Sequence, residues 1–288
     1  DGRFAFQLGP RKLDIRISTL PTINGEKVVL RILGSASTAA VLNLDKLNFV
    51  PEVLTPLKRV IHQSSGILFV TGPTGSGKTT TLYAALNFIN KPDINVITIE
   101  DPVEYEIPSI NQVQVNEKAG RSFATVLRSV LRQDPDVILV GEIRDVETAR
   151  VATQAAMTGH LVLTTLHTGD AIQAATRLID MGVDRFMVAP TVIGVISQRL
   201  VRRVCELCKV EYDPDPEYLE QYFVWRKEYR LPPLYRGEGC DSCGRTGYHG
   251  RLGIHEFLNM TARLREAVIE GKRYDDLHAL AVADGFKE

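Results

Sequence analysis

A glycine-rich segment at residues 72–79 constrains the fold of this chain more than any other feature of its sequence. It follows an apolar run at residues 67–71, which is typical of a buried strand, and it precedes a helical pattern. Its spacing matches G-x-x-x-x-G-K-[ST], in which glycines turn backbone amides toward phosphate oxygens at the positive end of a helix. The predicted nucleotide-binding residues are Gly72, Pro73, Thr74, Gly75, Ser76, Gly77, Lys78, Thr79 and Thr80.

Two side chains of this segment carry specific chemistry. We expect the Lys78 ammonium to reach the β- and γ-phosphates of a nucleoside triphosphate, ATP, and the Thr79 hydroxyl to ligate Mg²⁺. The alternative is an ordinary glycine-rich turn. The strand before the segment and the helix after it favour the phosphate-binding interpretation.

Apolar strands alternate with helical patterns from residue 67 onward. This βαβ rhythm is typical of an α/β fold in which helices cover both faces of a mostly parallel sheet. A helix that begins at Ser122 has the clearest pattern, because its apolar residues form one stripe while Arg128 and Arg132 share another face. The expected strands are 67–71, 95–99, 137–140 and 161–165, and the expected helices begin at Lys78, Ser122, Asp145 and Asp170.

Acidic side chains follow two of these strands, at the edge where open α/β sheets bind ligands. Glu142 comes after residues 137–140, and we expect it to order the attacking water and accept its proton. A glutamate that caps the next helix is the alternative. Glu100 and Asp101 end another strand and are expected to face Mg²⁺ through water, whereas Glu104 fits a surface position equally well.

Histidines flank the strand at residues 161–165. His167 follows the strand, where it could contact the γ-phosphate, and we predict a functional role for it. His160 precedes the strand and is less specific, since a single histidine is more often structural.

The first 33 residues predict a small antiparallel sheet. Apolar residues alternate with polar ones on both sides of the turn at residues 9–10, and the pair Asn24 and Gly25 favours a tight hairpin. Residues 34–40 are small and polar, which is typical of a linker or hinge. Because the pattern begins in the middle of a strand, we expect a further domain upstream.

Charge and hydropathy exclude several classes of protein. The chain has 34 Lys and Arg against 35 Asp and Glu, a balance that argues against a general polyanion binder. It lacks a long apolar run or a signal peptide at its start, so we expect a cytoplasmic protein. The basic cluster of Arg199, Arg202 and Arg203 lacks interleaved aromatics, which disfavours the alternative of a nucleic-acid translocase.

All four cysteines fall in two C-x-x-C pairs, a strong indication of zinc. Four protein ligands leave no open position for water, so the zinc site should be structural. Two disulfides are the alternative, and His249 or His255 could replace a cysteine ligand. The long segment between the pairs predicts a folded arm with a helix near residues 216–229. The expected ligands are Cys205, Cys208, Cys240 and Cys243.

Four motifs, at residues 72–79, 100–104, 137–145 and 160–167, stand in a fixed order. That order resembles the type II secretion and type IV pilus assembly ATPases, and residues 13–21 and 25–31 resemble the second N-terminal domain of that family. The resemblance implies a RecA-like P-loop NTPase core that hydrolyses ATP in a homo-hexamer and moves an inner-membrane platform protein. It also implies recruitment to the inner membrane by a membrane-anchored cytoplasmic protein, through the upstream domain. From the charge balance we expect no nucleic-acid partner.

The same resemblance assigns roles to four arginines. Arg16 and Arg31 match arginines that reach from the N-terminal domain toward the triphosphate, and Arg128 and Arg132 match a pair near the subunit boundary. Inserted on closure, such side chains would neutralise transition-state charge. Salt bridges on strand and helix surfaces are the alternative. The cysteine segment resembles a zinc element that the pilus retraction ATPases lack.

These features together predict the organisation and the function of the chain. The main hypothesis is an ATPase that powers type II protein secretion across the bacterial outer membrane, and type IV pilus assembly is the alternative. The expected parts are the end of the second N-terminal domain (1–33), a linker (34–46), the RecA-like ATPase domain (47–203), the tetracysteine zinc element (204–256) and C-terminal helices (257–288).

Overall fold

A computed structural model describes residues 2–9, 11–33, 43–215, 217 and 233–287 of the chain. It separates into two compact units, one formed by residues 1–198 and 255–288 and the other by residues 199–254. The linker expected at residues 34–40 lies outside the described residues, as does all of the helix expected near residues 216–229 except Glu217.

The N-terminal residues form the expected antiparallel sheet, with strands β1 (Gly2–Leu8), β2 (Arg11–Thr22) and β3 (Gly25–Leu33) in that order. The hairpin between β2 and β3 closes with a hydrogen bond from the Thr22 hydroxyl to the Gly25 carbonyl oxygen, 2.7 Å long. The register places Arg16 directly opposite Arg31. Opposite residues of antiparallel strands lie on the same face, so these two arginines are neighbours.

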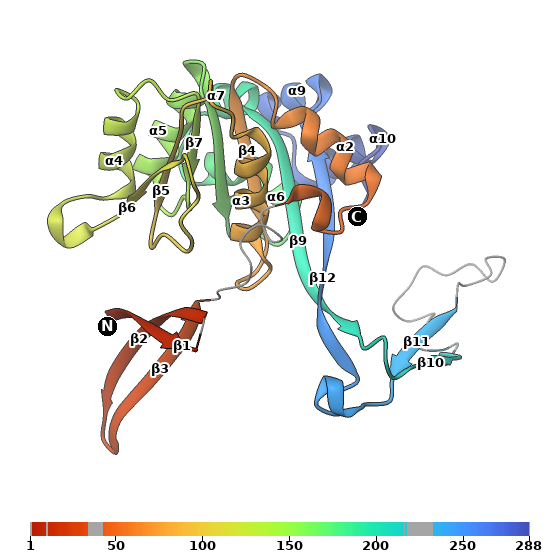
Figure 1. The fold of residues 1–288 in the computed structure, drawn as a ribbon. Coiled ribbons are helices and arrows are strands. Elements are labelled where there is room, and N and C mark those ends of the chain that lie inside the picture. The colour runs from red at the N-terminus through yellow and green to blue at the C-terminus, as the bar shows by residue number, and fades with distance from the viewer. Residues whose placement is uncertain (1, 10, 34–42, 216, 218–232, 288) are drawn as a thin grey trace. The chain divides into compact units, whose positions relative to one another are not determined.

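The larger unit is built on a seven-stranded sheet with the order β12-β9-β4-β8-β7-β5-β6 (Figure 1). The strand pairs from β9 across to β6 are parallel, and every strand predicted from the alternating pattern is present among them. This confirms the α/β fold. The strands are β4 (Gly66–Thr71), β5 (Val96–Glu100), β6 (Asn111–Gln114), β7 (Val137–Val140), β8 (Leu161–Leu166), β9 (Val192–Val204) and β12 (Tyr248–Asn259).

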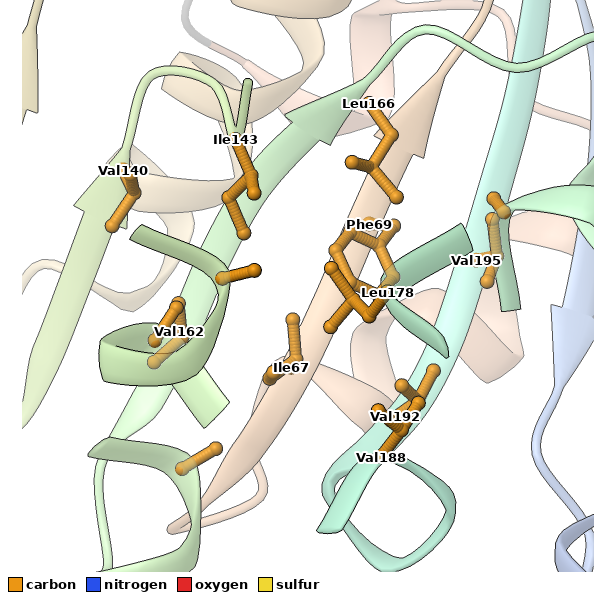
Figure 2. Close-up of a cluster of buried hydrophobic side chains, with 14 of the residues drawn as sticks. Ile67, Phe69, Val140, Ile143, Val162, Leu166, Leu178, Val188, Val192 and Val195 are labelled. Carbon is orange, nitrogen blue, oxygen red and sulfur yellow. The ribbon is translucent and has the colours of Figure 1, made fainter. Parts of the chain in front are cut away.

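Helices cover both faces of this sheet, because alternate residues of each strand point to opposite sides. Leu68 and Val70 of β4 pack with the helices of one face, and Ile67 and Phe69 pack with those of the other (Figure 2). The first face carries η1 (Leu44–Lys46), α2 (Pro51–Val60) and α3 (Lys78–Ile89). The second carries α4 (Phe123–Val130), α5 (Val146–Met157), α6 (Ala171–Asp180), α7 (Arg185–Thr191), α9 (Ala262–Glu270) and α10 (Tyr274–Ala283).

Three helices begin where the sequence predicts, because each has a side-chain cap. The oxygens of Ser122, Asp145 and Asp170 accept hydrogen bonds from backbone amides three residues later, at 3.3, 2.8 and 2.8 Å. Such caps satisfy amides that have no partner within the helix. A short 3-10 turn, η2 (Glu117–Ala119), precedes the first of them. Among the described residues, every helix is too short or too polar to cross a lipid bilayer.

The smaller unit contains the two-stranded antiparallel sheet of β10 (Lys209–Tyr212) and β11 (Leu234–Gly237) and the turn η3 (Asp241–Cys243). One basic side chain of the cluster at residues 199–203 has an aromatic partner, which the local sequence does not reveal. The Arg202 guanidinium lies 4.0 Å from the centre of the Tyr248 ring. This tyrosine comes from β12, far along the chain.

Candidate active site

Residues 72–77 form a loop between β4 and α3, and Lys78 and Thr79 begin the helix, as the spacing predicts. Gly72, Gly75 and Gly77 have φ angles of 138°, 80° and 89°, which L side chains rarely adopt. A Cβ on Gly72 would lie 2.2 Å from the backbone oxygen of Gln198 on β9. The glycine at position 72 is therefore required by the close approach of two backbones.

Lys78 is the first residue of α3, so its side chain starts at the positive end of the helix. Its ammonium group donates to the carbonyl oxygens of Gly72 and Pro73, at 2.8 and 3.1 Å. Burial holds the pKa of Lys78 below its ordinary value, and the negative charge of Glu142 partly opposes this shift. The lysine thus lies over the loop and within the field of an acidic side chain.

A cavity of about 180 Å³ opens beside the loop, at the carboxyl edge of the parallel sheet. It is smaller than the roughly 300–1,000 Å³ of a pocket that holds a whole drug-sized ligand, so it can enclose only part of such a ligand. Six of its lining residues are predicted to be functional. These are Lys78, Thr79, Glu100, Asp101, Glu142 and His167.

Glu100 is a buried carboxylate with three neutral donors. It accepts hydrogen bonds from the Tyr83 hydroxyl, from the Thr98 hydroxyl at 2.5 Å and from the Gln112 amide at 3.1 Å. Burial and the Glu100 charge both raise the pKa of Tyr83, which therefore remains a donor. The Tyr83 oxygen also accepts from the backbone amide of Glu104 at 3.3 Å. These three hydrogen bonds hold Glu100 in the cavity wall.

Glu142 follows β7 and is mostly buried. Its Oε2 lies 2.6 Å from Arg144 Nε and 3.7 Å from His167 Nε2. The hydrogen bond that Arg144 donates to Glu142 raises the pKa of Arg144 above its ordinary value. The alternative of a helix cap does not hold for Glu142, because Asp145 accepts the capping bonds from Thr148.

His160 lies outside this cavity. Its Nδ1 is 2.9 Å from the Ala155 carbonyl oxygen and 3.2 Å from the Thr158 hydroxyl. It lines a different cavity, together with His62 and Lys91, at the opposite edge of the sheet from His167. This geometry supports a structural role for His160.

The four predicted arginines do not line the cavity. Arg128 forms an ion pair with Glu147 at 2.8 Å, and Arg132 folds back to donate to the Arg128 carbonyl oxygen at 2.8 Å. Both side chains are at the exposed end of α4. Arg16 and Arg31 are exposed on the N-terminal sheet. Their catalytic roles remain predictions.

The four cysteines of the smaller unit come together, and their sulfur atoms all lie within 4.8 Å of one another. Neighbouring sulfurs are 3.8–3.9 Å apart, close to the edge of about 3.8 Å in a tetrahedron with Zn–S bonds of about 2.3 Å. All four are free thiols, so the disulfide alternative is not formed. Backbone amides of Cys240 and Gly247 donate to Cys243 Sγ and lower its pKa. The cluster fits a zinc ion.

The two histidines proposed as substitute zinc ligands are not in this cluster of described residues. The His255 ring packs on Phe49, with ring centroids 4.1 Å apart, in the larger unit. Burial lowers the pKa of His255 to about 4.

Several residues that shape the site are not evident from sequence patterns. Tyr83, Gln112 and Gln198 contact positions that are well separated from them along the chain, so neither a motif nor a periodicity indicates them. Thr98 and Arg144 each lie two residues from a predicted glutamate, but no motif marks them. The residues are Tyr83, Thr98, Gln112, Arg144 and Gln198.

Comparisons with known proteins agree with these features. The Type IV pilus assembly ATPase PilB of Thermus thermophilus is 53% identical over 287 residues, which are 100% of this chain and 32% of that protein. The Type II secretion system protein HxcR of Pseudomonas aeruginosa is 49% identical over 287 residues, 100% of this chain and 57% of that protein. The Type II secretion system ATPase E of Vibrio cholerae is 47% identical over 268 residues, 93% and 52% of the two chains. The chain thus spans between about a third and somewhat over half of these relatives.

Solved structures share the fold. The pilus retraction motor PilT with bound ADP matches with a TM-score of 0.68 and 30% identity, over 97% of this chain and 69% of that one. The Legionella pneumophila ATPase DotB matches with a TM-score of 0.65 and 24% identity, over 99% and 68% of the two chains. The family model of the Type II/IV secretion system proteins matches residues 1–287. Together with the phosphate loop and the parallel sheet, this match shows that the chain belongs to the Type II/IV secretion system protein family.

Proposed function

We propose that this chain binds ATP with Mg²⁺ and hydrolyses it to ADP and phosphate. The observation that carries the proposal is the meeting of a phosphate loop, two strand-end carboxylates and a histidine at one cavity. Phosphoryl transfer needs little covalent participation by the protein beyond positioning and charge compensation, and these groups supply both. The names of the relatives, which include ATPases of secretion and of pilus assembly, support the same activity.

The loop residues and Lys78 would bind the triphosphate. Backbone amides at the start of α3 would donate to phosphate oxygens, and the Lys78 ammonium would leave its carbonyl partners in the loop and bind the β- and γ-phosphates. Thr79, Glu100 and Asp101 offer the oxygen ligands that Mg²⁺ prefers, directly or through water. When bound, Mg²⁺ neutralises negative charge on the phosphates.

Glu142 would orient the attacking water and accept its proton. Its carboxylate lies in the cavity wall, and its ion pair with Arg144 restricts its rotation. His167, 3.7 Å from the same carboxylate oxygen, would contact the γ-phosphate and respond to its presence. Glu100, fixed by three neutral donors, would position water around the metal rather than remove protons.

The work done with this energy is also a proposal. We infer a homo-hexameric motor of type II secretion that acts on an inner-membrane platform protein, with Arg16, Arg31, Arg128 and Arg132 completing the site on closure. Arg128 would then release its ion pair with Glu147 and contact the nucleotide instead. Type IV pilus assembly is the second candidate, favoured by the 53% identity to a pilus assembly ATPase. We further propose Zn²⁺ as a structural metal of the tetracysteine element.

Replacement of the predicted base tests the activity. Purified protein should release phosphate from Mg-ATP, and Glu142→Gln should release it at least about a hundredfold more slowly while it still binds ATP, because the amide keeps the size of the side chain but cannot accept the proton. Glu270→Gln, an exposed change at the end of α9, is the control and should match the wild type. Wild-type turnover by Glu142→Gln would remove this residue as the base. Absence of hydrolysis by the wild-type hexamer would reject the function.

A further inference from the structure

Gln198 is a buried residue on β9 whose side chain contacts both the phosphate loop and the helix α3 that follows it. Its Nε2 donates to the carbonyl oxygen of Ser76 at 2.6 Å, and its Oε1 accepts from the Thr81 hydroxyl at 2.8 Å. The Gln198 side chain is 3% exposed, so water cannot easily replace either bond. One carboxamide thus joins the middle of the loop to the first turn of α3.

The partners determine how this amide is oriented. A carbonyl oxygen only accepts hydrogen bonds, so the NH₂ group of Gln198 must face Ser76. The remaining oxygen then faces Thr81, whose hydroxyl can donate to it. The reverse orientation would place two oxygens against each other at a buried position.

The contact with Ser76 concerns the shape of the phosphate loop. Such a loop turns its amides toward the ligand, so its carbonyl groups must turn away and find donors elsewhere. Gln198 supplies this donor to Ser76. The backbone oxygen of Gln198 also lies close to Gly72, since a Cβ atom on Gly72 would be only 2.2 Å from it. Side chain and backbone of one residue therefore constrain two points of the loop.

We propose that Gln198 is a positioning residue that holds the phosphate loop in its ligand-binding shape. The inference rests on the proposed function, since it concerns the same loop. Gln198 does not line the cavity, and it acts through Ser76 and Thr81. Preorganised amides bind a phosphate without the cost of ordering the loop during binding.

Gln198 is the last residue of the larger unit before the tetracysteine unit begins at Arg199, and β9 continues without a break to Val204. The strand that leads into the tetracysteine unit is therefore tied to the loop at its point of entry. Nucleotide binding should stiffen residues 199–204 through this tie, and by reciprocity their disturbance should alter nucleotide affinity.

Four variants and calorimetry with a non-hydrolysable ATP analogue and Mg²⁺ test the proposal. Gln198→Met keeps the length of the side chain but removes both hydrogen bonds, and Thr81→Val removes one, whereas Thr81→Ser keeps a hydroxyl and should rescue binding. Thr153→Val is the matched control, because Thr153 is equally buried and donates to the Ala149 carbonyl oxygen in α5 at 2.8 Å. Each measurement is made well below the unfolding temperature of that variant.

We expect Gln198→Met to raise the Kd about tenfold, which corresponds to about 1.4 kcal/mol and matches one to two buried neutral hydrogen bonds. KM for hydrolysis should rise in step with Kd while kcat changes less, since ground state and transition state both need the loop. Amide hydrogen exchange at residues 72–81 should accelerate in Gln198→Met and not in Thr153→Val. Protection of residues 199–204 on binding should be present in the wild type and lost in Gln198→Met.

The outcomes separate the two proposals. If the wild type fails to bind the analogue, the proposed function itself is rejected. If the wild type binds and Gln198→Met binds equally well, the positioning role is overturned and the proposed function stands. Equal losses in Gln198→Met and Thr153→Val would also overturn it, because they would indicate general destabilisation. Unchanged exchange at residues 199–204 on binding would overturn the tie to β9.

Discussion

Removal of one oxygen atom from Tyr83 tests how the site holds its deepest carboxylate. Tyr83→Phe keeps the ring in the core and deletes the hydroxyl that donates to Glu100. Glu100 would keep the Thr98 and Gln112 donors but lose the third. Because Glu100 is only 4% exposed, water cannot readily take the place of the lost donor. The carboxylate would then be incompletely solvated within the protein.

The size of the effect follows from these contacts. A hydrogen bond to a charged group contributes about 1.5–3 kcal/mol to stability. The backbone amide of Glu104 also loses its acceptor, but it is nearer to solvent, so this second loss lowers stability less. We therefore expect Tyr83→Phe to lower the free energy of unfolding by about 2 kcal/mol. For a unit of this size such a loss lowers the melting temperature by about 4–8 °C.

Thermal unfolding at neutral pH, followed by circular dichroism, measures the change. Tyr105→Phe is the control, because Tyr105 stacks edge-on against Tyr83 with centroids 5.9 Å apart, yet its hydroxyl is not a donor to Glu100. The control should melt within about 1 °C of the wild type. A Tyr83→Phe variant that melts with the control would refute the claim that Glu100 depends on this donor.

Two further predictions concern other parts of the chain. The folded-state pKa of His255, about 4, lies below its ordinary value of 6.5, so the unfolded state binds more protons between these values and stability falls as pH drops from 6.5 toward 4. When urea unfolding is compared at pH 7 and pH 4.5, His255→Phe should remove about 1–2 kcal/mol of that loss of stability, a figure reduced because the ring is partly exposed. The control is His62→Asn, which replaces an exposed histidine in ring contact with Phe88 and should leave the loss unchanged. Equal pH dependence in both variants would contradict the role given to His255. Metal analysis should find one zinc per chain. Chelation of the zinc should unfold the tetracysteine unit while the nucleotide-binding unit stays folded, and hydrogen exchange measures both. Freshly purified protein without zinc would contradict the zinc site.

Sequence patterns predict the elements of the sheet core because the local signals are strong there. Strands such as β7 are buried along their whole length, and the helix that follows it begins at a capping aspartate, Asp145. The phosphate loop is predicted residue by residue, because its glycines meet backbone requirements that other residues cannot. The pairing of the two cysteine motifs follows from spacing alone.

Other elements have no such local signal. Strand β9 passes from a fully buried half to an exposed half, so it has neither a continuous apolar run nor a regular alternation. Strand β6 is short, polar and at the sheet edge, and helix α2 contains Pro56. The contacts of Glu100 and Gln198 join distant segments, which only the folded chain brings together.

Calorimetric titration of the protein with a non-hydrolysable ATP analogue and Mg²⁺ determines whether the phosphate loop binds a triphosphate. The wild type should give a saturable heat of binding, and Lys78→Ala should bind at least about tenfold more weakly, because the ammonium over the loop would be lost. Lys91→Ala, a change of an exposed lysine at the opposite edge of the sheet, should bind as the wild type does. No heat with the wild type, or equal affinity for wild type and Lys78→Ala, would show that this loop does not bind the triphosphate.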